Sequence, residues 1–299
     1  MGRRLEATLG ILNGAIGDYL ERTGNGLATD MQLIRGPGPH GPKVVVLVHG
    51  LMCTETVFKM KDGSDYGSRL AEDLGFSPVY VRYNSGLAIP QNGALLAQRL
   101  EALVGDWPTA VEELLLLGFS LGGLVMRSAC HAALDKGHRW LALVRRAIYV
   151  GTPHQGAPAE RAGRVLGALL RAAPDPVTRL IGEIGDLRSA AIKDLGDARF
   201  TEAPCGDEPL ALGDRRHPVP LLPQIRHYLI AGSVSPRLAG LFGDAIVPIS
   251  SGTNGQKRVR GCPQLPPHNV KIVAGIAHMT LPCHPHVYEQ IRAWCQEAE

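Results

Sequence analysis

Six short and nearly continuous apolar runs recur along this chain of 299 residues, and they limit the possible fold more than any other feature. Each ends close to a glycine, histidine, serine or asparagine. Runs in which almost every position is apolar are typical of strands buried on both faces of a parallel sheet. The runs are VVVLVHG (44–50), PVYVRYN (78–84), ELLLLGF (113–119), RRAIYVGT (145–152), RHYLIAGSV (226–234) and VKIVAGIAH (270–278).

Helical patterns lie between several of these runs. The segments 94–104 and 122–137 have apolar residues at helical spacing. Near the N-terminus an apolar stripe of the same kind predicts an amphipathic helix that docks on the domain. Strand and helix in alternation indicate an α/β fold with a mostly parallel, doubly wound sheet. The N-terminal stripe consists of Leu5, Leu9, Leu12, Ile16 and Leu20.

The interval 155–224 breaks this alternation, because it contains no convincing strand. Its segments 157–173 and 186–200 have helical patterns, and we interpret the interval as a helical cap inserted over the carboxyl edge of the sheet. A helical excursion without function is the alternative, since insertions in loops cost little. The expected organisation is an N-terminal helix and linker at 1–42, a core at 43–154 and 225–299, and the cap between the two parts of the core.

Composition excludes several classes of protein. A net charge of +3 with no basic cluster interleaved with aromatic residues argues against nucleic-acid binding. No apolar run approaches the ~20 residues of a membrane span, and polar residues interrupt the N-terminal stripe, which argues against a signal peptide. The six cysteines form no CxxC pair and have no zinc-type spacing, although their even number permits disulfides. We therefore expect a cytoplasmic protein that uses no metal or organic cofactor.

A serine between glycines follows the leucine-rich run. Gly118-Phe119-Ser120-Leu121-Gly122 fits the pattern G-x-S-x-G, in which a nucleophilic serine lies on a sharp turn from strand to helix. Among 36 glycines the pattern alone is weak evidence. Here it comes after a strand pattern and opens a helix pattern, so Ser120 is a candidate nucleophile. We expect the glycines to avoid a collision of side chains across the turn.

A serine nucleophile needs a base and an acid, which follow it along the chain in the order acid, then histidine. His278 comes directly after the last strand pattern and is the expected base; His284 and His286 are alternatives in the same loop, and His268 precedes the strand. Asp244 is the expected acid, because it is the only carboxylate between positions 215 and 288. Two earlier candidates, Asp207 and Asp214, belong to the cap.

An oxyanion produced by attack of Ser120 needs two backbone N–H donors. The N–H of Leu121 follows the nucleophile, and the N–H of Leu51 follows the first strand pattern, so these two are the expected donors. We expect His49 to brace that loop rather than act as a base. Phe119 and Met126 are expected to pack in the core.

Five blocks of sequence together resemble serine α/β-hydrolases of the lipase and esterase type, most of all the bacterial relatives of the inositol-deacylase (PGAP-like) group. The resemblance covers about 43–295 and implies an α/β-hydrolase fold and hydrolysis of carboxylic esters by Ser120, Asp244 and His278. It does not extend to the cap. The blocks are VVVLVHGL, GFSLGG, YVGTPHQGAP, GDAIVP and AHMTLPCHPHVYEQI.

The predicted function is therefore that of an esterase or lipase that forms an acyl-serine intermediate on short- to medium-chain esters. Met52 and Pro153 in core loops, with Leu166 and Leu169 in the cap, are the predicted substrate contacts. Acyl transfer or thioester cleavage would use the same triad. A non-catalytic α/β-hydrolase that serves as a binding module is the alternative from another class.

Overall fold

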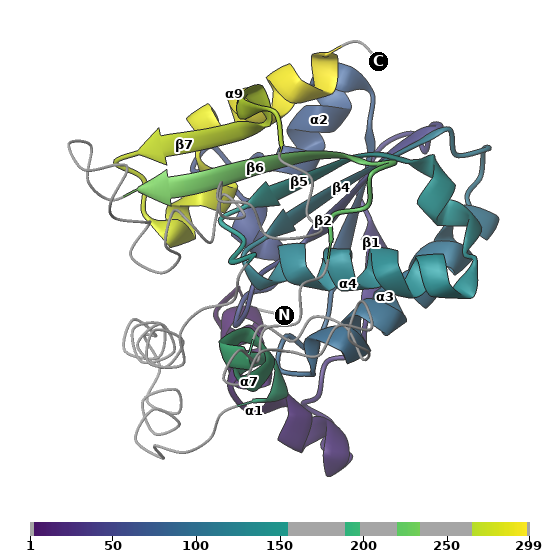
Figure 1. The fold of residues 1–299 in the computed structure, drawn as a ribbon. Coiled ribbons are helices and arrows are strands. Elements are labelled where there is room, and N and C mark those ends of the chain that lie inside the picture. The colour runs from purple at the N-terminus through teal and green to yellow at the C-terminus, as the bar shows by residue number, and fades with distance from the viewer. Residues whose placement is uncertain (1–2, 155–188, 198–219, 234–264, 298–299) are drawn as a thin grey trace, which may run out of the picture.

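The computed structural model describes residues 3–154, 189–197, 220–233 and 265–297. One seven-stranded sheet runs through them in the order β1-β3-β2-β4-β5-β6-β7, and only β1 is antiparallel to its neighbour (Figure 1). The strands are β1 (Gln32–Arg35), β2 (Lys43–Val48), β3 (Ser77–Arg82), β4 (Glu113–Phe119), β5 (Val144–Val150), β6 (Arg226–Ser233) and β7 (Val270–Ala274).

Helices cover both faces of this sheet. On one face lie α3 (Ile89–Gly105) and α4 (Leu121–Lys136), and on the other lie α2 (Tyr66–Leu74) and α9 (Pro285–Gln296) (Figure 1). The leucine run of β4 explains why two layers form. Leu114 and Leu116 enter the core beneath α3 and α4, whereas Leu115 and Leu117 enter the core beneath α2 and α9. Alternate side chains of a strand point to opposite faces, so a continuous apolar run requires both cores.

The six strands predicted from apolar runs all form, within a few residues of the expected bounds. The segment 1–42, expected to hold a helix and a linker, also contains a strand that the sequence did not indicate, because Gln32–Arg35 forms the edge strand β1 against β3. Helix α7 (Ala190–Asp197) confirms a helical segment inside the interval 155–224. The remainder of the predicted cap lies mostly outside the described residues, so the cap stays a prediction.

Four short 3₁₀ helices complete the described secondary structure. Two of them follow strands at the carboxyl edge of the sheet, where the candidate site lies. They are η1 (Glu55–Phe58), η2 (Arg139–Leu143), η3 (Pro267–Asn269) and η4 (His278–Cys283).

Helix α1 (Arg3–Arg22) docks on the domain, but not through the predicted apolar stripe, of which only Leu20 is buried and Leu5 is 47% exposed. The buried side of the helix consists mainly of small residues, because a helix that packs this closely leaves no room for leucines. Glycines set its close approach. A Cβ on Gly17 would overlap the Asn84 side chain, and a Cβ on Gly14 would lie 2.6 Å from the backbone N of Met52. An ion pair between Glu6 and Arg82 adds a polar contact to β3. In the part of the chain that the structure describes, no helix combines the length and apolar character needed to cross a membrane. Its described cysteines, Cys53, Cys130, Cys283 and Cys295, are free thiols.

Candidate active site

Ser120 occupies the turn between β4 and α4 in a strained conformation. Its φ is 52° and its ψ is −122°, a region that residues with side chains seldom adopt and that tertiary structure must hold in place. The backbone N–H of Ser120 donates a hydrogen bond of 2.8 Å to Val150 O at the end of β5. Strand β5 thereby fixes the turn from which the serine side chain projects.

Two glycines of the motif allow this turn, for different reasons. A Cβ on Gly118 would lie 2.6 Å from Gly123 Cα, so its collision across the turn is with Gly123 and not, as expected, with Gly122. A Cβ on Gly122 would instead lie 2.2 Å from Val48 O, in the neighbouring strand β2. The second glycine therefore lets the start of α4 pack directly on the end of β2.

His278 is the histidine that lies beside Ser120. Its Nε2 is 2.9 Å from Ser120 Oγ, which is hydrogen-bond distance. The imidazole is only 3% exposed and packs with its ring centroid 4.9 Å from that of Phe119. The alternatives take other positions, since His284 caps the N-terminus of α9 and accepts a hydrogen bond from the backbone N–H of His286.

A tyrosine that sequence reasoning missed holds the segment that carries His278. The hydroxyl of Tyr66, at the start of α2, donates to Leu281 O at 2.7 Å and accepts from the backbone N–H of His284 at 3.0 Å. Both groups lie in or directly after η4. No local signal could have identified Tyr66, because its partners are more than 200 positions away along the chain.

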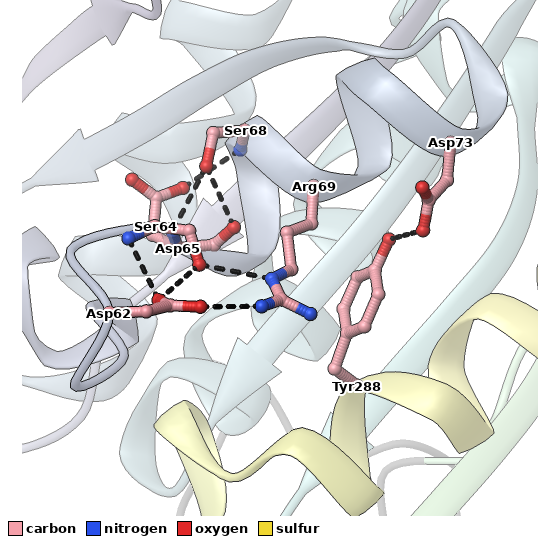
Figure 2. Close-up of polar contacts among 7 residues, drawn as sticks. All are labelled: Asp62, Ser64, Asp65, Ser68, Arg69, Asp73 and Tyr288. Carbon is pink, nitrogen blue, oxygen red and sulfur yellow. Dashed lines mark hydrogen bonds and ion pairs between the residues drawn. The ribbon is translucent and has the colours of Figure 1, made fainter.

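Helices α2 and α9 are also joined by side chains, which Figure 2 shows. Tyr288 of α9 donates to Asp73 Oδ2 at 2.6 Å, and the Arg69 guanidinium lies 5.5 Å from the centre of the Tyr288 ring. Asp65 and Ser68 form a capping box that begins α2. Since η4 leads directly into α9, these contacts fix where the His278 segment lies over Ser120.

The loop after β2 passes beside the serine. A Cβ on Gly50 would lie 3.1 Å from Ser120 Cβ. His49 Nδ1 lies 2.9 Å from Gly50 O, and its ring stacks on Tyr83 with centroids 4.3 Å apart. Burial lowers the pKa of His49 to about 4, so the imidazole is neutral at neutral pH and Nδ1–H is the donor to the carbonyl. His49 therefore braces this loop, as predicted.

The two predicted oxyanion donors flank Ser120. Leu121 is the first residue of α4, and the first N–H groups of a helix have no acceptor within it. Leu51 follows Gly50 in the loop that passes the serine, and among the described residues no hydrogen-bond acceptor is assigned to its N–H or to that of Leu121.

The other residues predicted to belong to the site or to lie near it are either buried or outside the described residues. Met52 is 5% exposed and packs against Gly14 of α1, and Pro153 is buried after β5. Phe119 and Met126 are buried in the core, as expected. The predicted acid and the predicted cap contacts lie outside the described residues, and so do the two alternative acids: Asp244, Leu166, Leu169, Asp207 and Asp214.

Sequence reasoning also missed a cluster of buried polar side chains near β5. Arg127 Nη1 donates to His154 Nδ1 at 2.8 Å, and burial, reinforced by the charge of Arg127, lowers the pKa of His154 well below its ordinary value. Next to it, the Tyr149 hydroxyl lies 3.1 Å from His227 Nδ1. Within the described ranges no three His, Cys, Asp or Glu side chains gather in a way that could hold a metal ion.

The fold is similar to that of solved structures. No protein family matches the sequence, and no curated protein matches it significantly. The lipase BlEst2 of Bacillus licheniformis in its propeptide form superposes with a TM-score of 0.52 at 17% identity, over 88% of this chain and 53% of that chain. An alpha/beta hydrolase fold protein from Chitinophaga pinensis superposes with a TM-score of 0.50 at 13% identity, over 90% and 98%. Naproxen esterase from Bacillus subtilis gives 0.49 at 14%, over 89% and 87%.

The first two similarities, together with the parallel sheet and its flanking helices, define the fold. The chain has the α/β-hydrolase fold, as predicted. Identities this low show the fold alone. The chemistry has to be argued from the site.

Proposed function

We propose that this protein hydrolyses carboxylic esters through an acyl-enzyme formed on Ser120. The observation that carries the proposal is the 2.9 Å distance between His278 Nε2 and Ser120 Oγ, at a serine with positive φ between a strand and a helix. A nucleophile within hydrogen-bond reach of a base is the arrangement that acyl transfer requires. The fold shared with lipases and esterases supports the same reading.

In the proposed mechanism Ser120 Oγ attacks the ester carbonyl while His278 Nε2 accepts its proton. The resulting oxyanion accepts hydrogen bonds from the N–H groups of Leu51 and Leu121. His278 then gives the proton to the leaving alcohol, and the acyl-serine forms. A water molecule, deprotonated by the same imidazole, attacks the acyl group, and the proton passes from His278 to the leaving Ser120 Oγ as the acid is released.

Asp244 is the proposed partner of His278, on the order of residues along the chain. An acid in this role holds the imidazole in the tautomer that accepts the serine proton. Asp244→Asn should therefore lower kcat by about 10⁴-fold. If Asp207→Asn or Asp214→Asn has that effect instead, the acid comes from the interval 155–224.

The proposed substrates are esters with short- to medium-length acyl chains, contacted by Met52, Pro153, Leu166 and Leu169. Each buried methylene contributes ~0.8 kcal/mol, which is nearly fourfold in the specificity constant. We expect kcat/KM to rise from acetyl to butyryl or hexanoyl esters and then to fall. The segment 160–200 can be shortened to test the role of the cap. If the dependence of kcat/KM on acyl length then stays the same, the cap does not line the acyl site.

The finer resemblance to the inositol-deacylase-related group remains part of this proposal and rests on the five sequence blocks. Thioesters and acyl acceptors other than water are tested in the same assays. A p-nitrophenyl ester that is cleaved much more slowly than the matched acyl thioester would favour a thioesterase. Product ester formed in the presence of an added alcohol, in excess of free acid, would favour acyl transfer.

The deciding experiment measures hydrolysis of p-nitrophenyl butyrate by the wild type and two pairs of variants. Ser120→Ala should lose activity by about 10⁴-fold or more, whereas Ser128→Ala, a buried serine of the same helix, should keep it. His278→Ala should be as severe as Ser120→Ala, and His286→Ala should be mild. Near-normal turnover by a correctly melting Ser120→Ala variant would contradict the proposal.

A further inference from the structure

The loop that carries Leu51 contains a second strained residue. Within the described ranges only two residues other than glycine have a positive φ, and they are Met52, at 60°, and Ser120, at 52°. A bulky side chain rarely adopts this region, so the surrounding structure has to hold it there. Met52 directly follows Leu51, one proposed oxyanion donor, and Ser120 directly precedes Leu121, the other.

Both peptide groups adjoining Leu51 are held by hydrogen bonds. On one side Gly50 O accepts from the His49 ring at 2.9 Å and from Cys53 N–H at 3.3 Å. A trans peptide is planar, so the Leu51 N–H points away from that carbonyl in a fixed direction. On the other side the N–H of Met52 donates to Ser85 Oγ at 3.1 Å.

Ser85 itself is held rigidly. It is 1% exposed and follows β3, in a segment fixed by Asn84, whose side-chain amide donates to Gly17 O of α1 at 2.9 Å and accepts from Gly86 N–H at 3.1 Å. Gly14 of α1 packs on Met52 from the other side. The strained peptide is therefore clamped between α1 and the segment after β3.

We propose that Ser85 is a positioning residue for catalysis, which acts by holding the Met52 peptide so that the Leu51 N–H is aimed at the oxyanion. The proposal rests on the ester-hydrolase function and adds to it a residue that touches no substrate. Without the Ser85 hydroxyl, Met52 N–H loses its acceptor and the strained conformation loses a restraint. The hydrogen bond from the Leu51 N–H to the oxyanion is then weaker in the transition state, while ground-state binding of the ester changes little.

The chain offers a matched control in Ser77. Ser77 is also 1% exposed, and its hydroxyl also accepts from a backbone N–H, that of Gly41, at 2.9 Å. It lies at the first residue of β3 and so at the opposite edge of the sheet from Ser120. The same chemical change at Ser77 therefore removes the acceptor of a backbone N–H, and a 3.3 Å hydrogen bond to Pro39 O with it, without touching the oxyanion loop.

The test compares Ser85→Ala with Ser77→Ala on p-nitrophenyl butyrate, with active sites counted by a fluorophosphonate so that only folded enzyme enters kcat. A second measurement is the Ki of an alkyl trifluoromethyl ketone, which adds to the serine as a tetrahedral oxyanion. For Ser85→Ala we expect kcat to fall about tenfold, less than the loss of a whole donor. We expect Ki to rise by the same factor and KM to stay within about twofold. In Ser77→Ala we expect kcat and Ki to stay near the values of the wild type.

A second variant approaches the same loop from α1. Gly14→Ala would place a Cβ 2.6 Å from Met52 N, whereas Gly26→Ala meets no atom within 4 Å. We expect Gly14→Ala to lower kcat and raise Ki together, and Gly26→Ala to change neither. Equal effects of Ser85→Ala and Ser77→Ala, or a loss of active sites with unchanged kcat per site, would overturn the positioning role alone. A wild type without Ser120-dependent hydrolysis would overturn the proposed function and this role with it.

Discussion

The substitution Gly122→Ala tests how closely α4 must approach β2 for the proposed site to work. A Cβ at this position would lie 2.2 Å from Val48 O and 2.4 Å from His49 O. Ordinary contact begins near 3.4 Å, so the start of α4 or the end of β2 has to move by about 1.2 Å (3.4 − 2.2). Both clashing atoms are backbone atoms, and neither can rotate away.

The expected cost has a kinetic and a thermodynamic part. A displacement of about 1 Å between reacting groups can cost about 10²-fold in rate, and this one separates Leu121 and Ser120 from the Leu51 loop. Overpacking of this kind destabilises a fold by about 1–3 kcal/mol. We therefore expect kcat/KM for p-nitrophenyl butyrate to fall about 10²-fold and the melting temperature to fall by several degrees.

Gly105→Ala is the matched control, because it is also a glycine in a helix. Its Cβ would meet only the flexible end of Arg139, at 3.7 Å. This variant should keep wild-type kinetics and melt at the same temperature or slightly higher. If Gly122→Ala is as active and as stable as Gly105→Ala, the packing argument is refuted.

Three further outcomes are expected. The melting temperature should fall as pH decreases from 6.5 to 4, because burial lowers the pKa of His227 from 6.5 to about 4 and the unfolded chain then binds a proton that the native imidazole does not. His227→Gln should make this fall less steep without abolishing it, since burial also lowers the pKa of His49 and of His154. Tyr66→Phe removes the hydroxyl that holds η4, so kcat/KM should fall by about tenfold and stability by about 1 kcal/mol, whereas Tyr19→Phe, at an exposed site, should do neither in the same assays. Asp65→Ala removes the cap of α2 and should lower the free energy of unfolding by about 1 kcal/mol in urea titrations; an unchanged midpoint would contradict the capping assignment.

Most of the sheet was predictable because β2 to β6 are buried on both faces. Strand β7 was found from its apolar run although it is largely exposed in the structure, with Ile272 39% exposed. Runs such as Leu114–Leu117 contain no polar residue, so the first and last apolar residues of a run give the bounds of the strand closely. Strand β1 could not be predicted in this way, because it is an edge strand of four residues whose side chains are half-buried or exposed. Short segments at an edge are stabilised by the neighbour they pair with, which local sequence does not reveal.

The serine and the histidine could be proposed from the sequence because each follows a strand pattern directly. The residues that hold these two side chains and the Leu51 loop in place could not be proposed from the sequence. The Tyr66 hydroxyl bonds to Leu281 and His284, which lie near the other end of the chain. Ser85, after β3, accepts from the backbone N–H of Met52, after β2. Such contacts depend on the tertiary packing of distant segments, whereas the G-x-S-x-G pattern records a constraint within one turn.

Covalent labelling of the serine tests the central claim most directly. The protein is treated with a fluorophosphonate and digested, and the modified residue is identified by mass spectrometry, in the wild type and in His278→Ala. Activation of Ser120 by His278 predicts one label per chain, on Ser120, with a rate that falls by orders of magnitude in the variant. A label on another serine, or equal rates in the two proteins, would contradict the account.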